Sequence, residues 1–382
     1  MNKTKTIILS SFPIPYNGIA SWPKMFEYYL RHQEHKIDYI ISPQTKNPIS
    51  EVHYLPVRVP TFISRKVSRF WKHYKYQPYW QQLKKILYKE KNVIIQIIDN
   101  LGLLYAIDYF SKSNGLRGRF KIIYFIHGYD YNLLPKEREK FYSIIDDLVV
   151  LTYSSYKFQL SKTHAMPCEV THIYNGVDGN KFYIPSGLEK KKIRTELNFD
   201  DNKLYFLWLS QDRPKKGLHI ILRAWNDLMK KFPNIELLII GTKNKIKGEG
   251  INWIGRLPND KLPDYYQASD FFLFSTLCHE GHPLSLTEAL KSGSVCIASD
   301  IDPIREILNN GEYGRLVEFP HSPDSWYKAI IEEIKKYEQK NRLNPYASQM
   351  PENLYDIDVW CDNINCLISK WENRMLKTIS EF

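Results

Sequence analysis

The stretch LFSTLCHEGHPLSLTEALKSGSVCIASD, Leu273–Asp300, contains two short apolar runs separated by a loop and an amphipathic segment. Proline is common in the first turn of a helix, and glycine is common just past a helix end. Pro283 and Gly293 therefore predict a helix over about Leu284–Lys291. Because short apolar runs next to turns are typical of buried strands, the stretch indicates the order strand, loop, helix and strand, which is one unit of a parallel sheet.

Apolar runs alternate with amphipathic stretches on both sides of this segment, almost to the end of the chain. This alternation is typical of a parallel sheet that is covered by helices. Each half of the chain supplies five apolar runs, which is enough for a doubly wound sheet of its own. The runs are TIILSSF, KIDYIIS, VIIQIID, KIIYFIHG and DLVVLTY in the first half, and KLYFLWLS, IELLIIG, INWIG, DFFLFST and SVCIAS in the second.

The chain has 382 residues, which is about twice the usual length of a single domain. We therefore expect an α/β protein with two Rossmann-like, doubly wound parallel-sheet domains, residues 1–180 and 181–359, that face a central cleft. The boundary is expected in the turn-rich and then charged segment Tyr174–Lys192. Apolar residues recur near helical spacing after Pro351, so residues 360–382 are expected to form a terminal helix that packs back on the first domain.

The composition favours a reduced compartment. The chain contains five cysteines, an odd number, with no Cys-x-x-Cys pair, so neither a disulfide framework nor a zinc site is indicated. The apolar run Ile7–Leu9 near the amino terminus is too short for the core of a signal peptide. No window approaches the ~18 apolar residues that a membrane span needs. We therefore expect a cytoplasmic protein that is not integral to a membrane.

The segment Thr61–Lys91 concentrates the positive charge of the chain, whose formal net charge is +11. It contains nine Lys or Arg residues and one acid, Glu90, together with eight aromatic residues. Cations mixed with aromatic rings are typical of a face that binds an anionic membrane or an anionic substrate. The alternative is a solvated helix pair whose aromatic rings pack inward. Nucleic acid would also accept such a patch, but we expect no nucleic acid partner. Under the membrane interpretation, the protein is peripheral on the inner face of the cytoplasmic membrane.

Two acids lie around the expected helix start, Glu280 in the loop and Glu288 within the helix. Free backbone amides and the positive end of the helix dipole make such a start a binding site for phosphate. Carboxylates beside a phosphate site must bind something other than phosphate, and sugar hydroxyls are suitable hydrogen-bond donors to them. The simpler alternative is that Glu280 only caps the helix and that Glu288 is solvated.

These residues resemble the retaining glycosyltransferases of family 4, a group with the two-Rossmann architecture called GT-B. Glu280 and Glu288 match the E-x7-E motif of that family. The resemblance implies that Glu280 contacts the hydroxyls of the donor sugar and that Glu288 holds the ribose of its nucleotide. It also implies donor contacts at the turn and helix start between the two acids, which are Gly281, His282, Pro283 and Leu284.

The stretch LSQDRPKKG, Leu209–Gly217, occupies the place of the family's loop that neutralises the donor diphosphate, and Lys216 stands in the lysine position. Lysine suits this task because it is a mobile point charge for phosphate oxygens. At the arginine position the chain has Gln211 instead, and Arg213 follows two residues later. Either Arg213 reaches the diphosphate from a shifted loop, or one positive charge is missing from the site.

Two residues in the first half complete the site that the resemblance implies. His127 in FIHGYD follows an expected strand, where the family often places a histidine that lines the sugar pocket. Gly18 in FPIPYNGIASW stands roughly where the family has a glycine pair, with Asn17 in the other place. The expected catalytic residues are thus His127, Lys216 and Glu280, and Gly18 is an expected donor-binding residue.

The implied reaction moves a glycosyl group from a UDP- or GDP-linked sugar to a hydroxyl of a glycan or lipid-linked acceptor, with retention of the anomeric configuration. We expect neither a cofactor nor a metal, although Asp-x-Asp strings occur at Asp300–Asp302 and Asp356–Asp358. The expected setting is the assembly of bacterial surface polysaccharide or glycolipid. The alternatives are a non-catalytic pseudo-enzyme that binds sugar nucleotide, which the departure at Gln211 leaves open, and a GT-B epimerase.

Overall fold

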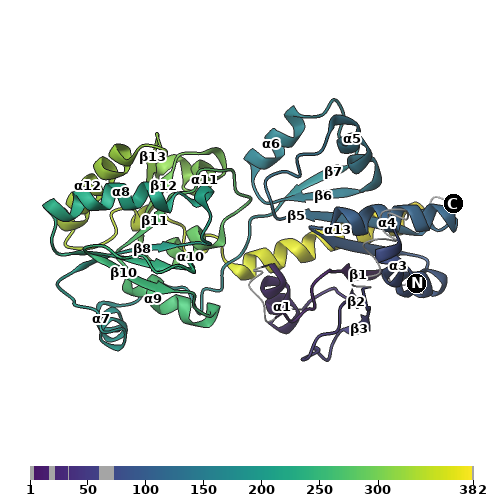
Figure 1. Cartoon of the computed structure of the whole chain (residues 1–382). Coiled ribbons are helices and arrows are strands. Elements are labelled where there is room, and N and C mark those ends of the chain that lie inside the picture. Colours follow the sequence, from purple (N-terminus) through teal and green to yellow (C-terminus); the bar gives the residue numbers. More distant parts are fainter. Residues whose placement is uncertain (1–3, 17–21, 33, 60–72, 381–382) are drawn as a thin grey trace. The chain divides into compact units, whose positions relative to one another are not determined.

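The computed structural model describes residues 4–16, 22–32, 34–59 and 73–380 (Figure 1). The chain divides into two compact units, each with its own parallel sheet. Unit 1 comprises Met1–Tyr174 and Asp358–Phe382, and unit 2 comprises Asn175–Ile357. The expected α/β class with two Rossmann-like, parallel-sheet domains is confirmed.

The sheet of unit 1 has the strand order β3-β2-β1-β4-β5-β6-β7, and every neighbouring pair is parallel. Parallel strands that helices cover on both faces are shielded from water, so they are apolar along their length. All six residues of the central strand β4 are accordingly buried. The strands are β1 (Lys5–Leu9), β2 (Tyr39–Ser42), β3 (His53–Pro56), β4 (Val93–Ile98), β5 (Phe120–Ile126), β6 (Asp147–Val150) and β7 (Glu169–His172). The helices are α1 (Trp22–His32), α3 (Gln77–Lys89), α4 (Leu101–Ser113), α5 (Pro135–Ile144), α6 (Tyr153–Ser161) and α13 (Ile357–Ser380).

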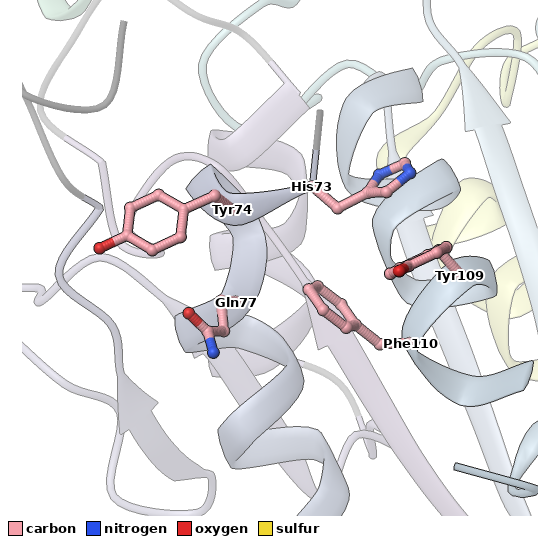
Figure 2. A pocket seen from close by; sticks show the side chains of 5 residues that line it. All are labelled: His73, Tyr74, Gln77, Tyr109 and Phe110. Atoms are coloured by element: carbon pink, nitrogen blue, oxygen red, sulfur yellow. The ribbon is translucent and has the colours of Figure 1, made fainter. Parts of the chain in front are cut away.

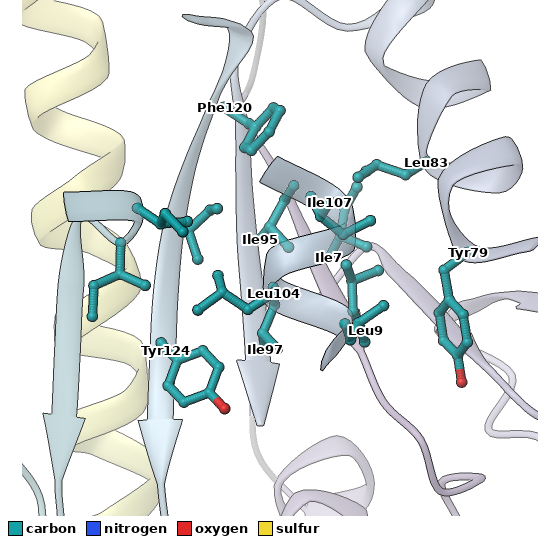
Figure 3. Packing of buried hydrophobic residues seen from close by; sticks show 14 of the residues in the cluster. Ile7, Leu9, Tyr79, Leu83, Ile95, Ile97, Leu104, Ile107, Phe120 and Tyr124 are labelled. Atoms are coloured by element: carbon teal, nitrogen blue, oxygen red, sulfur yellow. The ribbon is translucent and has the colours of Figure 1, made fainter. Parts of the chain in front are cut away.

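One face of this sheet forms a hydrophobic core with helices α3 and α4 (Figure 3). Ile7 and Leu9 of β1 pair in register with Ile95 and Ile97 of β4, and all four side chains belong to this core. Leu104 of α4 packs in the same cluster. Burying one such side chain contributes about 1.5–3 kcal/mol, so this core positions the ends of β1 and β4 firmly.

Helix α13, drawn in yellow in Figure 1, joins unit 1 from the far end of the chain. Asp147 at the start of β6 is fully buried, and its Oδ2 accepts hydrogen bonds from Lys370 Nζ at 2.7 Å and Trp371 Nε1 at 2.9 Å. Tyr29 of α1 donates its hydroxyl proton to Asn365 Oδ1 at 2.5 Å. The helix is therefore held to unit 1 by buried polar contacts as well as by packing.

The sheet of unit 2 has the strand order β10-β9-β8-β11-β12-β13, again all parallel. Alternate residues of its strands enter two cores, so that Phe206 and Trp208 pack on one face, while Tyr205 and Leu207 pack on the other. The strands are β8 (Leu204–Leu209), β9 (Ile235–Ile240), β10 (Ile251–Gly255), β11 (Phe271–Phe274), β12 (Val295–Ser299) and β13 (Arg315–Val317). The helices are α7 (Gly187–Glu196), α8 (Leu218–Lys231), α9 (Leu262–Ala268), α10 (Leu284–Lys291), α11 (Asp302–Ile307) and α12 (Pro323–Gln339).

Helix α10 has the bounds that the sequence predicts, Leu284–Lys291, and each of the ten apolar runs overlaps a strand. The sequence did not predict β3, β7 and β13 as strands. All three lie at the edge of a sheet, and most of their residues are only partly buried or exposed. Within the described residues, no helix combines the length and the apolar character that crossing a membrane requires.

Candidate functional site

The candidate site of unit 2 lies where the strand order reverses, between β8 and β11. In doubly wound sheets, ligands bind at such a reversal, outside the carboxyl ends of the strands. The loop after β8 carries Lys216, and the loop after β11 carries Glu280. The topology therefore brings together two segments that lie far apart in the sequence and that the sequence marked separately.

Lys216 and Glu280 form an ion pair through Lys216 Nζ and Glu280 Oε1. Thr276 also donates its hydroxyl proton to Glu280 Oε1, at 2.8 Å. The side chains of Lys216 and Glu280 are each 18% exposed, so both charges are shielded yet reachable from solvent. The pair presents a cation suited to phosphate and a carboxylate suited to hydroxyls at one place in the fold.

The two loops are fastened to each other by hydrogen bonds. Leu277 N–H donates to the Lys215 carbonyl at 2.7 Å, and the Ser275 hydroxyl donates to the Lys216 carbonyl at 2.9 Å. Trp208 Nε1 of β8 donates to the Ser275 hydroxyl at 3.0 Å. Gly217 is required at this junction because its φ is +73° and a Cβ there would lie 1.9 Å from the Ser275 carbonyl oxygen. The backbone around Lys216 is therefore fixed before any ligand binds.

Helix α10 begins directly after the loop that carries Glu280, with Pro283 at its N-cap and no side chain capping its first turn. His282 is buried, its carbonyl accepts a hydrogen bond from Asn175 Nδ2 at 3.0 Å, and its ring lies edge-on to Tyr355. Gly281 is buried as well. These contacts hold the turn, and the uncapped amides at Leu284 make the helix start suitable for an anion.

The simpler interpretation, in which Glu280 caps the helix and Glu288 is solvated, is wrong. Glu280 bonds to Lys216 and Thr276, and no side chain caps α10, so Glu280 is not its cap. Glu288 is half-buried on α10, and Tyr266 donates its hydroxyl proton to Glu288 Oε2 at 3.0 Å. Burial, and secondly the Glu288 carboxylate, raise the pKa of Tyr266 well above its ordinary value. Glu288 is thus an oriented group and not a solvated one.

Arg213 and Gln211 are both exposed on the loop after β8. The Arg213 carbonyl accepts the N–H of Lys216 at 2.9 Å, so Arg213 starts the turn that presents the lysine. Within the described part of the chain, no ion pair holds the Arg213 guanidinium. A donor contact by Arg213 from a shifted loop, and a site that lacks one positive charge, both stay predictions.

His127 follows β5 at the carboxyl edge of the unit 1 sheet. Its ring stacks on Trp22 with centroids 6.0 Å apart and an interplanar angle of 26°, and the backbone N–H of His127 donates to Asp99 Oδ1 at 3.3 Å. Burial lowers the pKa of His127 to about 4, although Asp99 opposes the shift, so the imidazole is neutral near pH 7. Gly18, the other expected residue of this half, lies outside the described residues.

The sequence did not mark Thr276, Asn175 or Asp99. Asp99 and Thr276 are the last residues of the apolar runs VIIQIID and DFFLFST, so their signal is a polar residue at the carboxyl end of an apolar run in a sheet of this type. Asn175 lies in the turn-rich segment that was assigned to the boundary between the domains. Its contact with the His282 carbonyl joins positions too far apart for sequence spacing to reveal.

The Asp-x-Asp strings make contacts with other side chains in the structure. Asp300 pairs with Arg305, Asp356 pairs with Lys291 at 2.8 Å, and Asp358 accepts the hydroxyl proton of Tyr28 at 3.1 Å. Over residues 4–16, 22–32, 34–59 and 73–380, no three His, Cys, Asp or Glu side chains cluster as a metal site would require.

The basic aromatic segment is described from His73 onward, since residues 60–72 lie outside the described ranges. Helix α3 buries Tyr79 and Trp80 in the unit 1 core, so these rings pack inward, as in the alternative that the sequence left open. Tyr88 is 61% exposed, and lysines occupy the outer side of the helix. Figure 2 shows a small hollow beside this helix, lined by His73, Tyr74, Gln77, Tyr109 and Phe110.

Residues 189–350, which hold most of unit 2, match the family described as glycosyl transferases group 1. The chain is similar to a phosphatidyl-myo-inositol mannosyltransferase from Mycobacterium tuberculosis, with 25% identity over 40% of this chain and 41% of the relative. It is also similar to an alpha-monoglucosyldiacylglycerol synthase from Streptococcus pneumoniae, with 25% identity over 50% of this chain and 42% of the relative. The match thus spans about two fifths of the length of each of these relatives.

The fold of the whole chain is similar to that of HepE from Anabaena, solved in complex with UDP and glucose. The TM-score is 0.69 at 14% sequence identity, and the similarity covers 96% of this chain and 99% of HepE. At 14% sequence identity, the similarity shows a shared fold alone.

Proposed function

The chain belongs to the GT-B glycosyltransferases of the family 4 type, and on this premise we propose that it transfers a sugar from a nucleoside diphosphate sugar to an acceptor hydroxyl. The proposed donor is UDP- or GDP-linked, and the proposed reaction is retaining and metal-independent. The observation that carries the proposal is the Lys216–Glu280 pair at the ends of β8 and β11, beside the uncapped start of α10.

The proposed roles follow from where charge develops. As the glycosidic bond breaks, negative charge grows on the leaving diphosphate, and Lys216 and the amides at Leu284 are suited to stabilise it. Glu280 accepts hydrogen bonds from the sugar hydroxyls, and Thr276 keeps its carboxylate oriented. Glu288 holds the nucleotide ribose from its place on α10. In a retaining reaction without an enzymatic nucleophile, the leaving phosphate oxygen accepts the proton of the attacking hydroxyl.

His127 is proposed to contact the donor sugar from unit 1. Its neutral imidazole offers one donor and one acceptor without adding charge next to a developing oxocarbenium centre. The stack with Trp22 fixes the plane of the ring. We therefore expect His127 to orient the sugar and not to transfer a proton.

A glycan or a lipid-linked molecule is the proposed acceptor. The names of the mycobacterial and pneumococcal relatives refer to a phosphoinositide and a diacylglycerol, which supports the lipid class. The proposed location is the cytoplasmic face of a bacterial membrane, in polysaccharide or glycolipid assembly. The exposed lysines of α3 support an electrostatic attachment to anionic lipid, whereas the inward rings Tyr79 and Trp80 do not support insertion of these aromatics.

The donor reaction is tested with the purified 382-residue chain and four donors: UDP-glucose, UDP-galactose, UDP-N-acetylglucosamine and GDP-mannose. Nucleoside diphosphate release is measured with and without EDTA, and NMR of the product reports the anomeric configuration. Lys216→Ala should lower release at least about 100-fold, since one preorganised donor is worth roughly 3 kcal/mol. Lys215→Ala is the matched control, because Lys215 is the exposed neighbour of Lys216.

Two acid variants separate the proposed roles. Glu288→Ala should weaken binding of the nucleoside diphosphate, whereas Glu280→Ala should mainly lower turnover. Negligible effects of both would remove the assignment. Binding without release by the wild type would favour the pseudo-enzyme, which Gln211 at the arginine position leaves open. Conversion of the donor into its sugar epimer would favour the epimerase.

Attachment to lipid is tested by flotation with vesicles of phosphatidylglycerol or of phosphatidylcholine. The chain should float with the anionic vesicles only, and 0.5 M salt should release it, because salt screens charges beyond about 3–10 Å. Lys85→Glu with Lys89→Glu should abolish flotation, and Lys328→Glu with Lys335→Glu on α12 is the control. Equal binding to both kinds of vesicle would contradict an electrostatic attachment.

A further inference from the structure

Asp99 is the first residue after β4 and has a φ of +52°, a conformation that non-glycine residues adopt uncommonly. Strained backbone of this kind persists where surrounding contacts impose it, and it concentrates at functional sites. Here the contacts are visible, since the Asp99 N–H donates to the Phe125 carbonyl of the neighbouring strand at 3.0 Å. The strand order of unit 1 reverses between β1 and β4, so Asp99 lies at the position where a doubly wound sheet binds ligands.

The carboxylate of Asp99 has one oxygen occupied and one open. Its Oδ1 accepts hydrogen bonds from the backbone N–H of His127 at 3.3 Å and from the Tyr131 hydroxyl, and the hydroxyls of Tyr131 and Tyr124 are hydrogen-bonded at 3.1 Å. Within the described part of the chain, Oδ2 accepts no hydrogen bond and no cation pairs with Asp99. The side chain is nevertheless exposed. One oxygen is therefore anchored while the other is held toward solvent beside His127.

The chemistry of this arrangement selects a class of ligand. A carboxylate with an open oxygen repels phosphate and accepts hydrogen bonds from hydroxyl groups. The adjacent His127 ring, stacked on Trp22, adds a neutral polar group next to it. We propose that Asp99 is a binding residue of unit 1 for a hydroxyl group of a saccharide, at a site that it shares with His127. This inference rests on the proposed function and adds a residue to it.

Two saccharides could supply the hydroxyl, the donor sugar and a sugar of the acceptor, and the experiment has an arm for each. Asp99→Asn is the test variant, because its amide oxygen retains the bonds to His127 and Tyr131 while NH2 replaces the open oxygen. Asparagine also tolerates a positive φ, so the turn is retained. Tyr131→Phe is the control that disturbs the anchored oxygen and leaves the open one.

In the acceptor arm, isothermal calorimetry of the full chain measures the binding of octyl glycosides of glucose, galactose, mannose and N-acetylglucosamine. In the donor arm, the same protein hydrolyses each of the four nucleotide sugars with water as acceptor, and KM and kcat are measured. Asp99→Asn should lose roughly tenfold to a hundredfold in one arm, as expected for a hydrogen bond to a charged group. The arm that changes identifies the saccharide. Binding of free UDP and the unfolding temperature should stay at their wild-type values.

Wild-type values for Asp99→Asn in both arms would overturn the inference, and so would a wild type that binds no glycoside together with an unchanged donor arm. A fall in both arms that Tyr131→Phe reproduces would also overturn it, because the effect would then come from the fold of the turn. Failure of the proposed function is recognised separately, by a wild type that releases no nucleoside diphosphate from any donor. In that case the binding of glycosides alone decides the role of Asp99: weaker binding by Asp99→Asn supports the inference, and unchanged binding or a wild type that binds no glycoside overturns it.

Discussion

Thr276 shows how a single hydroxyl controls a charged group. It is 1% exposed and donates to Glu280 Oε1, the same oxygen that pairs with Lys216. Thr276→Val keeps the shape of the side chain and removes the donor, so the carboxylate keeps only its contacts with Lys216 and with the Cys278 thiol, whose Sγ lies 3.7 Å from Oε1. We expect turnover to fall about tenfold, as for loss of a charged hydrogen bond, with little change in affinity for UDP. Steady-state nucleoside diphosphate release measures this effect.

Thr276→Ser is the matched control, because it restores the hydroxyl without the methyl group. It should recover most of the wild-type rate. If the serine variant is as slow as the valine variant, packing of the methyl group and not the hydroxyl is responsible. Sequence alone could not assign this role, because it required knowing which rotamer of Glu280 faces Lys216.

His127 gives a prediction for pH. Its pKa is about 4 in the folded chain because of burial, against an ordinary value of 6.5. Between these values the unfolded chain binds a proton that the folded chain does not, so the free energy of unfolding falls as pH falls from about 6.5 to about 4. His127→Gln should remove up to about 3 kcal/mol of this pH dependence. Urea denaturation at pH 7 and pH 4.5 measures the difference.

The matched control for this titration is His164→Gln, since His164 is exposed in the same unit. It should keep the pH dependence of the wild type. Above pH 6.5, the difference in the free energy of unfolding between His127→Gln and the wild type should not change with pH. A His127→Gln variant that loses stability in acid as steeply as the wild type would show that the imidazole is not buried in its neutral form.

At the scale of elements, the turn between β8 and α8 depends on one glycine. Gly217→Ala places a Cβ 1.9 Å from the Ser275 carbonyl oxygen at a φ of +73°, so the two loops must separate. We expect a loss of about 2–4 kcal/mol in the free energy of unfolding and weaker binding of UDP, because Lys216 moves with the turn. Thermal unfolding and calorimetry measure the two effects. Gly118→Ala is the control, since nothing lies within 4 Å of its Cβ position.

The elements that the sequence predicted are those with a clear apolar run or clear helix boundaries. The fully buried β4 is an apolar run that stands out in the sequence, and α10 is bounded by Pro283 and Gly293. The edge strands β3, β7 and β13 carry no such signal, because they are short and keep polar residues, whereas the edge strand β10 is the apolar run INWIG and was predicted. Aromatic rings on α3 were ambiguous for a related reason: an aromatic residue near a cation suits both a core and a surface, and only packing decides.

The candidate site was predictable in its residues and not in its contacts. Lys216 and Glu280 each stood in a stretch with a recognisable pattern, but their pairing depends on β8 and β11 being neighbours, which a linear sequence does not state. Asp99 had only the weak signal of a polar residue at the end of an apolar run, and its positive φ is visible only in the structure. Gln211 is the opposite case: the sequence shows the departure, and the exposed side chains of Gln211 and Arg213 give no contact that resolves it.

At the scale of the whole molecule, the chain leaves unit 1 at Tyr174, builds unit 2, and returns to unit 1 at Asp358. The returning helix α13 completes unit 1, because Trp371 is 6% exposed there and its Nε1 bonds to the buried Asp147 at 2.9 Å. Stability of unit 1 therefore depends on residues that are synthesised after unit 2. Folding of unit 1 is expected to finish only after unit 2 has been made.

Trp371→Ala tests this dependence. The change removes a large buried side chain and one hydrogen bond to Asp147, so it should cost about 3–5 kcal/mol, and the cost should fall on unit 1. Hydrogen exchange measured by mass spectrometry should show faster exchange in β6 and β7 and unchanged exchange in β11 and β12. Trp326→Ala is the matched converse, since Trp326 is fully buried in unit 2 with its Nε1 bonded to the Pro320 carbonyl at 2.9 Å. It should speed exchange in unit 2 and leave β6 and β7 protected; equal loosening of both units by either variant would show that the two units unfold as one.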